Sequence, residues 1–129
     1  MKQQSGFTLI ELIAVIVILG ILAATALPRF VDLSDAAEDA AVKGVAGALG
    51  SGAALNHANN IAKDAGLAGP TPTEVAKCTD VEALLEGSAL PSTDYVITPA
   101  TAIVEGAIAT CTLTYKGKTG IFTAYGVTP

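Results

Sequence analysis

The residue best placed to do chemistry in this chain is an acid in an apolar setting. Glu11 lies near the beginning of the run "FTLIELIAVIVILGILAATAL", which extends from Phe7 to Leu27 and is otherwise almost entirely apolar. A charged side chain inside a membrane-spanning segment is costly unless a partner offsets it, and such residues usually serve a function. Glu11 is therefore the first candidate functional residue, with the chemistry of an ion pair.

The two cysteines, Cys78 and Cys111, are the second candidate. In a chain exported behind an apolar N-terminus, the oxidising side of the membrane favours one intramolecular disulfide between them. The chain-entropy estimate for closing such a loop is roughly 3–4 kcal/mol of stability. The alternative is a pair of free, buried thiols.

The remaining polar residues form no catalytic or metal-binding pattern. His57 is the sole histidine, and no serine, aspartate or cysteine can be grouped with it, which favours a polar residue on a helix surface. The sequence shows no glycine-rich phosphate loop, no metal-ligand spacing and no nucleophile motif. We therefore predict a non-enzyme with no catalytic residues, no metal and no cofactor.

The charge balance bears on the choice of partners. The chain has 12 acidic and 7 basic residues, for a net charge of -5, and shows no basic patch. Its only close basic pair, Lys116 and Lys118, flanks Gly117 in a predicted turn. Because nucleic-acid binding needs clustered Lys and Arg to neutralise phosphates, no nucleic-acid partner is expected and a DNA-uptake role is disfavoured.

The apolar run has three interpretations. A cleaved secretory signal would use "ATA" at Ala24–Ala26 as its cleavage site, but the run is long for a signal peptide and contains Glu11. A plain signal anchor is long enough, since about 20 apolar residues span a bilayer, but it leaves Glu11 without a role. The third interpretation accounts for the length and the acid together.

That interpretation rests on a short leader with Lys2, followed by Gly6, Phe7, "TLIEL" and an apolar helix. The pattern resembles the class III signal of type IV pilins. The resemblance implies that prepilin peptidase cuts between Gly6 and Phe7 and methylates the new amino terminus on Phe7. It also makes Glu11, together with Phe7, the residue of subunit assembly.

Glu11 then has a physical role between subunits. After cleavage Phe7 carries an ammonium, which a carboxylate on a neighbouring helix can neutralise, and a low dielectric strengthens such a pair. The resemblance also places Gly20 and Pro28 at the helix-loosening positions of the family. Since Pro28 lacks an N–H, the segment between them either melts when subunits pack or forms a simple kink in a continuous helix.

After the apolar run the chain becomes amphipathic. The alanine-rich stretch "LSDAAEDAAVKGVAGALGSGAALNHANNIAKDAG" predicts a helix that ends at Gly66. Asp35 and Glu38 have the spacing of a capping box, unless the helix runs straight through them. Asp39 and Lys43 are spaced for an i,i+4 ion pair.

The C-terminal part predicts a short helix and then a sheet. "TDVEALLEG" is typical of a helix with Thr79 or Asp80 as its N-cap and Gly87 at its end. Further on, β-branched residues between turn signals predict strands at "YVIT", "TAIVEG", "IATCTLTY" and "GIFTAY". Alternation places Cys111 on the side of Leu113, facing the helix, and "KGKTG" predicts a hairpin turn.

These elements and the signal imply the α+β fold of type IV pilins, a long N-terminal helix packed on a small antiparallel β-sheet. By that resemblance residues 1–6 are the leader peptide, 7–28 the hydrophobic transmembrane and assembly helix, and 29–129 the globular head. Beyond the signal, "PRFVDLSDAAEDAAVKGVAGAL" and "SGAALNHANN" resemble the mannose-sensitive haemagglutinin pilin branch, which implies a surface-attachment fimbria of a Gram-negative bacterium.

The implied function is structural: a type IV pilus subunit that polymerises through its N-terminal helix into an extracellular filament for surface attachment. The implied partners are other copies in a helical homopolymer, prepilin peptidase, the pilus assembly machinery with minor pilins, and the inner membrane before assembly. A surface or carbohydrate ligand is compatible with this role. The alternative is a pseudopilin of a type II secretion system, which by resemblance usually carries a C-terminal calcium loop and lacks the disulfide.

The alternative from a different class is a ligand-binding module or an enzyme that the helix merely anchors. Either would need a pocket with converging polar groups. The sequence gives no sign of such a pocket. We therefore favour a structural protein over an anchored enzyme.

Overall fold

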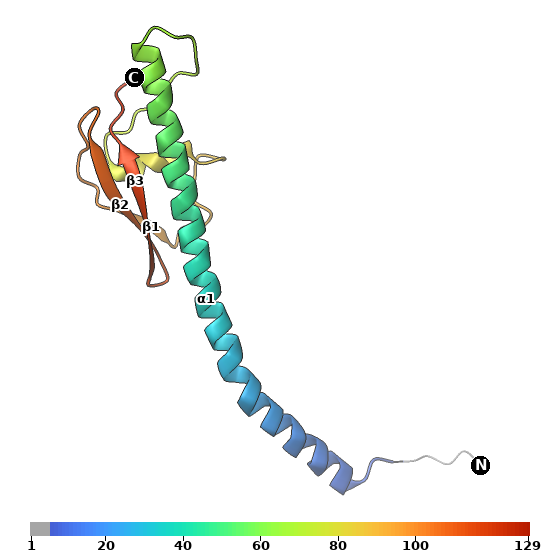
Figure 1. Ribbon diagram of the computed structural model, residues 1–129. Helices are drawn as coiled ribbons and strands as arrows, with labels where there is room; N and C mark the ends of the chain where they lie inside the picture. The colour runs from blue at the N-terminus through green and yellow to red at the C-terminus, as the bar shows by residue number, and fades with distance from the viewer. Residues whose placement is uncertain (1–5) are drawn as a thin grey trace. The chain divides into compact units, whose positions relative to one another are not determined.

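A computed structural model describes residues 6–129 of the chain. The described part contains one long helix, a short 3₁₀ helix and a three-stranded sheet (Figure 1): α1 Leu9–Asp64, η1 Cys78–Leu84, β1 Tyr95–Thr98, β2 Ile108–Tyr115 and β3 Lys118–Tyr125. The chain divides into two compact units, the first ending at Ala36 and the second spanning Ala37–Pro129. The long N-terminal helix and small antiparallel sheet confirm the predicted α+β architecture.

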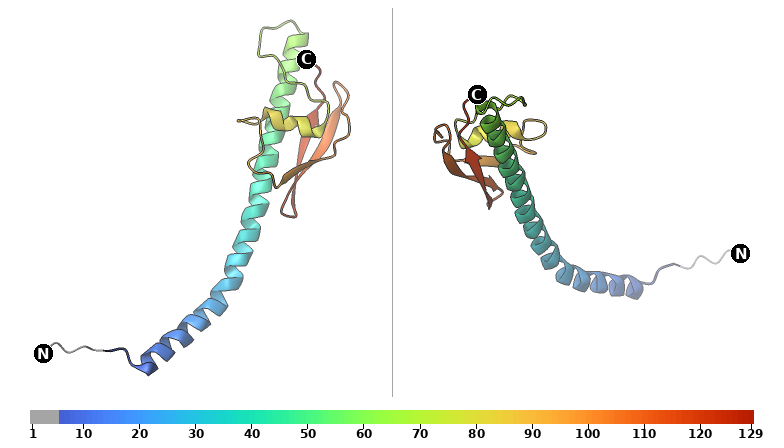
Figure 2. Two further views of the ribbon diagram at one scale, coloured as in Figure 1. Left: turned by 180° about the vertical axis from the view of Figure 1, so that it is seen from behind. Right: turned by 45° about the horizontal axis from the view of Figure 1, so that its top comes forward.

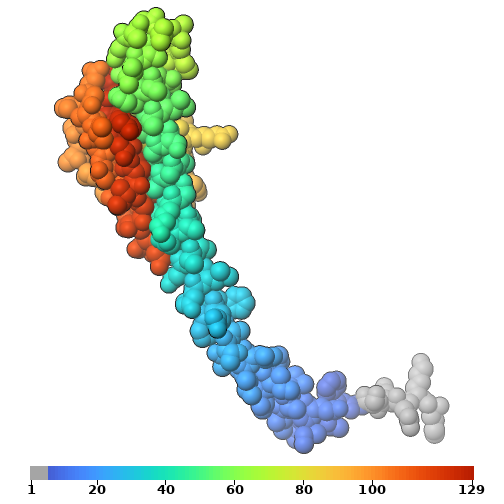
Figure 3. Space-filling view, viewed as in Figure 1, coloured from blue at the N-terminus to red at the C-terminus, as the bar shows by residue number. Residues whose placement is uncertain are grey.

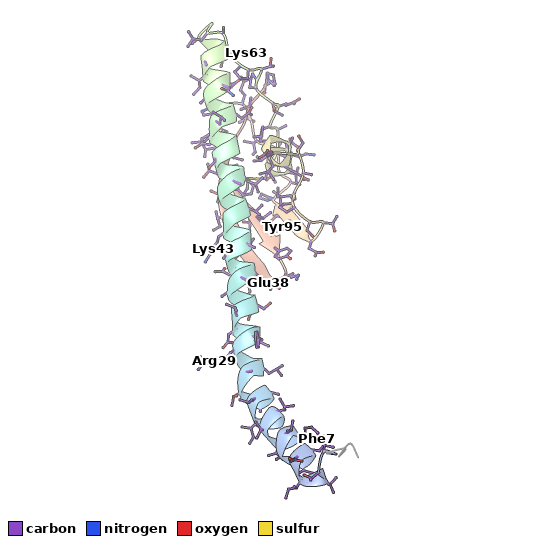
Figure 4. The ribbon with its side chains drawn as sticks, turned by 90° about the vertical axis from the view of Figure 1, so that its right-hand side faces the viewer. Phe7, Arg29, Glu38, Lys43, Lys63 and Tyr95 are labelled. Atoms are coloured by element: carbon purple, nitrogen blue, oxygen red, sulfur yellow. A yellow bond between two sulfur atoms is a disulfide. The ribbon has the colours of Figure 1, made fainter. Side chains whose placement is uncertain are left out.

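The part of α1 from Leu12 to Leu27 carries no charged side chain and is apolar on every side. Ile10, Leu19 and Leu27 are 75%, 59% and 70% exposed, and the side chains along this stretch point away from the helix all round (Figure 4). By length and composition α1 is able to cross a membrane. A helix that is apolar all round is stable only in apolar surroundings, so this stretch needs lipid or other helices around it.

The helix α1 continues through Gly20 and Pro28 without a break. Pro28 has no N–H to donate to the carbonyl one turn earlier. Close by, the hydroxyl of Thr25 donates to the carbonyl of Leu22 at 3.0 Å, so this polar side chain is satisfied within its own helix. Of the two interpretations of this segment, the structure has the continuous helix, and melting on assembly stays a prediction.

The acidic stretch of α1 lies inside the helix. The helix runs through Asp35 and Glu38 without a new start, so a capping box at this position is wrong and the continuous alternative is right. Asp39 and Lys43 form the predicted i,i+4 pair, with 2.6 Å between Nζ and the carboxylate. Since both side chains are largely exposed, this pair contributes only about 0.3–0.5 kcal/mol.

In the second unit one face of α1 forms half of the core. Its buried positions recur every three or four residues, which is the spacing of a single helical face: Val42, Ala46, Leu49, Ala53, Asn56 and Asn60. Gly120 of β3 lets the sheet come close to this face, because a Cβ added there would lie 2.8 Å from the Cβ of Ala46 and 2.9 Å from the carbonyl oxygen of Val42. Figure 3 shows the red segment, which contains β3, directly against this part of the helix.

The helix α1 ends at Asp64, and Gly66 caps it, as the sequence predicts. Gly66 adopts a left-handed φ of 74°. Its N–H donates to the carbonyl of Lys63 at 2.8 Å, and the N–H of Leu67 donates to the carbonyl of Ala62 at 2.9 Å. These two bonds form a Schellman motif, which satisfies carbonyl groups at the end of a helix.

The segment after α1 is fastened to the second unit by hydrogen bonds. The side-chain amide of Asn56 donates to the carbonyl of Thr73 and accepts from its N–H, both at 2.8 Å. Asn56 is buried, so its polar atoms need such partners. Two residues further on, Val75 and Val127 exchange backbone hydrogen bonds of 2.9 and 3.1 Å. The chain that leads to Cys78 is thereby held both to the helix and to the C-terminal residues.

The sheet has the order β1–β2–β3, with neighbouring strands antiparallel. As predicted, Cys111 and Leu113 of β2 face the core and are fully buried, whereas Thr110 on the opposite face is exposed. The predicted hairpin turn is formed by Lys116 and Gly117, with φ values of 46° and 79°, as in a two-residue turn of type I′. Figure 2 shows the sheet beside the same stretch of α1 from two further sides.

The predicted strand over residues 101–106 is wrong. The segment is irregular and makes a single β-bridge, between Ala102 and Lys77. Next to it, the N–H of Ile103 donates to the carbonyl of Ala76 at 2.6 Å. The edge of β2 is already paired with β1, so this connection bonds to the chain before η1 instead. Of its β-branched residues only Ile103 is buried, whereas Val104 is 72% exposed.

The predicted helix over residues 79–87 is shorter and more tightly wound than expected. It is a 3₁₀ helix, Cys78–Leu84, whose N-cap is Lys77 rather than either residue predicted for that position. Asp80 acts from inside the helix, where its carboxylate accepts from the N–H groups of Ala76 and Lys77, both at 3.0 Å. The 3₁₀ form is normally used in short pieces such as this one.

Replacing Gly120 with Ala should destabilise the second unit, because the new methyl group overlaps the backbone of α1. We expect a loss of about 1–3 kcal/mol in the free energy of unfolding. The matched control is Gly47→Ala, where nothing lies within 4 Å of the added Cβ and the change favours the helix by about 1 kcal/mol. Denaturant unfolding of the full-length subunit in detergent measures both, and equal stabilities would contradict the close approach.

Candidate functional site

Three hydrogen bonds join Thr8 and Glu11 at the start of α1. The backbone N–H and the hydroxyl Oγ1 of Thr8 both donate to Oε2 of Glu11, at 2.8 and 2.7 Å. In return the backbone N–H of Glu11 donates to Oγ1 of Thr8, at 3.3 Å. Together they form a capping box, in which the residue before a helix and its third residue satisfy each other's amide groups.

The capping box uses only one oxygen of the Glu11 carboxylate. Oε2 accepts both bonds from Thr8, whereas Oε1 has no hydrogen-bond partner among residues 6–129. A carboxylate has about four acceptor sites on its two oxygens, so Glu11 keeps the capacity for a further donor. Because the side chain is exposed, that donor can come from another molecule.

Thr8 is a site residue that the sequence reasoning missed. The signal is present in "TLIE", because a threonine followed three residues later by a glutamate and an apolar run is the signature of a capping box. The charge of Glu11 in an apolar run attracts attention first, and its position in the first turn is overlooked. Asp35 and Glu38 have the same spacing but form no capping box, because α1 continues through both residues.

The residues of the predicted cleavage site precede the helix. Gly6 and Phe7 have no regular secondary structure, and Phe7 is 84% exposed. Phe7 stands next to the first turn of α1 (Figure 4). The rest of the predicted leader, residues 1–5 with Lys2, lies outside the described residues. Gly20 and Pro28, which are predicted to loosen the helix, lie farther along the continuous helix α1.

A disulfide joins Cys78 and Cys111, the pairing that the sequence predicts. The two Cα atoms are 5.8 Å apart, and both side chains are fully buried. The bond connects η1 to the central strand β2. It therefore attaches the segment after α1 covalently to the sheet.

The tip of the β2–β3 hairpin is attached to α1 by a charged pair. Nζ of Lys116 lies 3.3 Å from the carboxylate of Glu38 and 5.3 Å from the ring centroid of Tyr115, which stacks on Tyr95 at 4.3 Å. The hydrogen bond to Glu38 raises the pKa of the Lys116 ammonium, and Tyr115 raises it further. Because Lys116 is exposed, the pair positions the turn more than it stabilises the fold.

His57 is only partly exposed, in contrast to the surface position predicted for it. Its ring stacks on Tyr125 of β3, with centroids 4.6 Å apart. Its Nδ1 and the Oδ1 of Asn60 are buried without a hydrogen-bond partner in the described part of the chain. Residues 6–129 enclose no pocket and bring no three His, Cys, Asp or Glu side chains together as a metal site.

Comparisons with known proteins give one family motif and two relatives that match part of the chain. A prokaryotic N-terminal methylation motif matches residues 1–27. The type IV narrow pilus major component PilA5 of Thermus thermophilus is 60% identical over 53 residues, which are 41% of this chain and 46% of that protein. The type II secretion system core protein G of Pseudomonas aeruginosa is 54% identical over 43 residues, 33% of this chain and 30% of that protein. No solved structure is significantly similar to the chain.

These similarities define a class of protein. The chain matches less than half the length of either relative, and less than half of the chain itself is matched. In residues 1–27, which match the methylation motif, and in its α+β architecture, the chain resembles type IV pilins. Both relatives are named as components of assemblies, and neither is named as an enzyme.

Removing the disulfide should lower the stability and the cellular abundance of the subunit. For Cys111→Ser we expect a loss of roughly 3–4 kcal/mol in unfolding free energy. The double variant Cys78→Ser/Cys111→Ser is the matched control, because it leaves no free thiol to form wrong disulfides. Denaturant unfolding and immunoblotting measure the two effects. Free-thiol labelling of both cysteines in the native, exported subunit would rule out the bond.

Proposed function

We propose that this chain is the structural subunit of a type IV pilus, which polymerises through its N-terminal helix into an extracellular filament for surface attachment. The observation that carries the proposal is an exposed carboxylate, Glu11, at the start of an apolar helix of membrane-spanning length, inside a segment that matches the methylation motif. The relative from Thermus, which is named as a pilus component, supports it.

In this proposal, cleavage gives each subunit a second charge. Prepilin peptidase removes residues 1–6 and methylates the new terminus on Phe7, which remains an ammonium. In the filament, Glu11 of one subunit neutralises the Phe7 ammonium of the next. The low dielectric of a helix bundle makes such a pair far stronger than in water. The pairing needs two copies, and it therefore favours the polymer over the separate subunits.

In this proposal the apolar stretch has two roles, one before assembly and one in the filament. Residues 7–28 hold the subunit in the inner membrane before assembly, and the same side chains pack on other copies in the filament afterwards. Residues 29–129 form the head. The partners are further copies in a helical homopolymer, the prepilin peptidase, and the pilus assembly machinery with its minor pilins. Gly20 and Pro28 loosen the helix where subunits pack.

A narrower proposal concerns the branch of the family. The stretches "PRFVDLSDAAEDAAVKGVAGAL" and "SGAALNHANN" support a pilin of the mannose-sensitive haemagglutinin branch, from a Gram-negative bacterium. A fimbria of that kind attaches cells to surfaces, and a carbohydrate ligand is compatible with it. The support here is the resemblance of these two stretches.

The second candidate is a pseudopilin of a type II secretion system. The similarity to core protein G of Pseudomonas favours it. Two features of this chain favour the pilus instead. A calcium loop near the C-terminus would need acidic ligands, but no acidic side chain follows Glu105. The chain also has a disulfide, which pseudopilins usually lack. Electron microscopy of sheared cell-surface filaments, with mass spectrometry of their subunit, separates the two candidates.

Changing Gly6 to Leu should stop the cleavage that the motif specifies. We expect full-length precursor to stay in the membrane and filaments to be absent. Ser5→Ala, one residue earlier, is the control and should still be processed. Intact-mass measurement of the subunit gives both results. A mature chain that begins at Leu27 would instead show that the "ATA" site is used and that the pilin-type signal is wrong.

Changing Glu11 to Val should abolish filaments while leaving the subunit processed, inserted and folded. For the monomer the change removes a charge that costs about 2.5–3.5 kcal/mol near the centre of a membrane helix, so insertion is unharmed. In the filament it leaves the Phe7 ammonium of a neighbour buried and unpaired, at a cost of roughly 3–5 kcal/mol for each subunit. Electron microscopy and quantification of sheared filaments measure the result.

The controls for this change separate charge from shape. Glu11→Gln should assemble poorly, because an amide donates and accepts hydrogen bonds without neutralising an ammonium. Glu74→Gln removes an exposed carboxylate from the second unit and should assemble normally. Filament numbers at the wild-type level from Glu11→Val would contradict the pairing.

A further inference from the structure

We propose that Thr8 is a positioning residue for assembly: it holds one oxygen of the Glu11 carboxylate in the capping box, so that the other oxygen is presented to the ammonium of a neighbouring copy. The inference rests on the proposed function and adds a residue to it. It assigns the two oxygens of Glu11 to different tasks. Oε2 serves the helix of its own subunit, and Oε1 serves the next subunit.

The geometry around Thr8 supports this division. Both donors of Thr8 converge on Oε2, at 2.8 Å from the N–H and 2.7 Å from the hydroxyl. Oε1 meets no donor within the described chain, and the side chain is exposed. Oε2 of the carboxylate is therefore held by hydrogen bonds within the subunit, and Oε1 can accept a hydrogen bond from another molecule.

The contact survives processing. All three hydrogen bonds lie between atoms of Thr8 and Glu11. Cleavage after Gly6 removes none of these atoms and leaves the new terminus one residue before Thr8. The mature subunit can therefore carry the same capping box as the precursor, with a cationic terminus added beside it.

The physical gain is pre-organisation. A free glutamate side chain rotates about several bonds and loses that freedom when it forms a fixed ion pair. A carboxylate already held by its own helix has lost most of that freedom before the partner arrives, so pairing costs less. The hydroxyl matters most here, since a hydrogen bond to a charged acceptor is among the stronger ones.

The simpler alternative is that Thr8 only caps the helix. Glycine distinguishes the two roles, because glycine at an N-cap costs the helix only a few tenths of a kcal/mol and has no hydroxyl to hold Glu11. If Thr8 only caps the helix, the Thr8→Gly subunit should assemble normally. If Thr8 positions Glu11, Thr8→Gly should fail to assemble, as should Thr8→Val. Thr8→Ser keeps the hydroxyl and should assemble.

The experiment expresses full-length Thr8→Ser, Thr8→Val and Thr8→Gly subunits in the pilus-forming cell. Mass spectrometry first measures the processed and methylated fraction of each, and filament yield is then counted per processed subunit. We expect a yield close to wild type for Thr8→Ser and about tenfold lower for the other two, the effect of losing one hydrogen bond to a charged group. A normal yield from Thr8→Gly, or a low yield from Thr8→Ser, would overturn the positioning role.

Glu11→Val in the same series separates the two proposals. If Glu11→Val gives no filaments while Thr8→Val and Thr8→Gly assemble normally, the positioning role is wrong and the proposed function stands. If Glu11→Val itself assembles normally, the proposed pairing fails and the role of Thr8 fails with it. Amide NMR of the subunit in micelles adds a direct test, because Glu11→Ala should shift the Thr8 N–H resonance.

Discussion

The two parts of the helix α1 have surfaces suited to different surroundings. From Leu12 to Leu27 α1 is apolar on every side, and no described residue covers this stretch. In the second unit it has a single apolar face, which packs on a sheet that approaches through Gly120. The first condition requires lipid or other helices around the protein, and the second requires a folded head. A membrane-held subunit that later packs against its own copies meets both conditions.

The same constraint explains the arrangement at the start of α1. An acid in this position is costly in lipid unless its oxygens have donors. Thr8 supplies two donors to one oxygen of Glu11, which satisfies part of the carboxylate within the subunit and caps the helix. It supplies no positive charge, so the strongest available partner for Glu11 is an ammonium from outside. In the function proposed here, the site of Glu11 is partly satisfied within one subunit and is completed by a second subunit.

Much of this could be predicted from the sequence, because the responsible signals are local. Helical periodicity and Gly66 predict where the helix ends. Alternation of apolar residues in β2 predicts that Cys111 is buried, and the turn residues "KGKTG" predict the hairpin. The strand expected at 101–106 is wrong, since composition cannot tell a buried connection from a strand when the edge of β2 is already taken. Thr8 was missed although its capping-box spacing is local, because the charge of Glu11 suggested a partner outside the chain.

The central claim is the pairing of Glu11 with the amino terminus of another copy. High-resolution cryo-electron microscopy of filaments sheared from the cell surface tests it most directly. The account predicts that the Glu11 carboxylate lies within about 4 Å of the Phe7 nitrogen of a neighbouring subunit, the limit for an ion pair, while its second oxygen still contacts Thr8. A Glu11 side chain paired with its own terminus, or surrounded only by apolar groups, would contradict it.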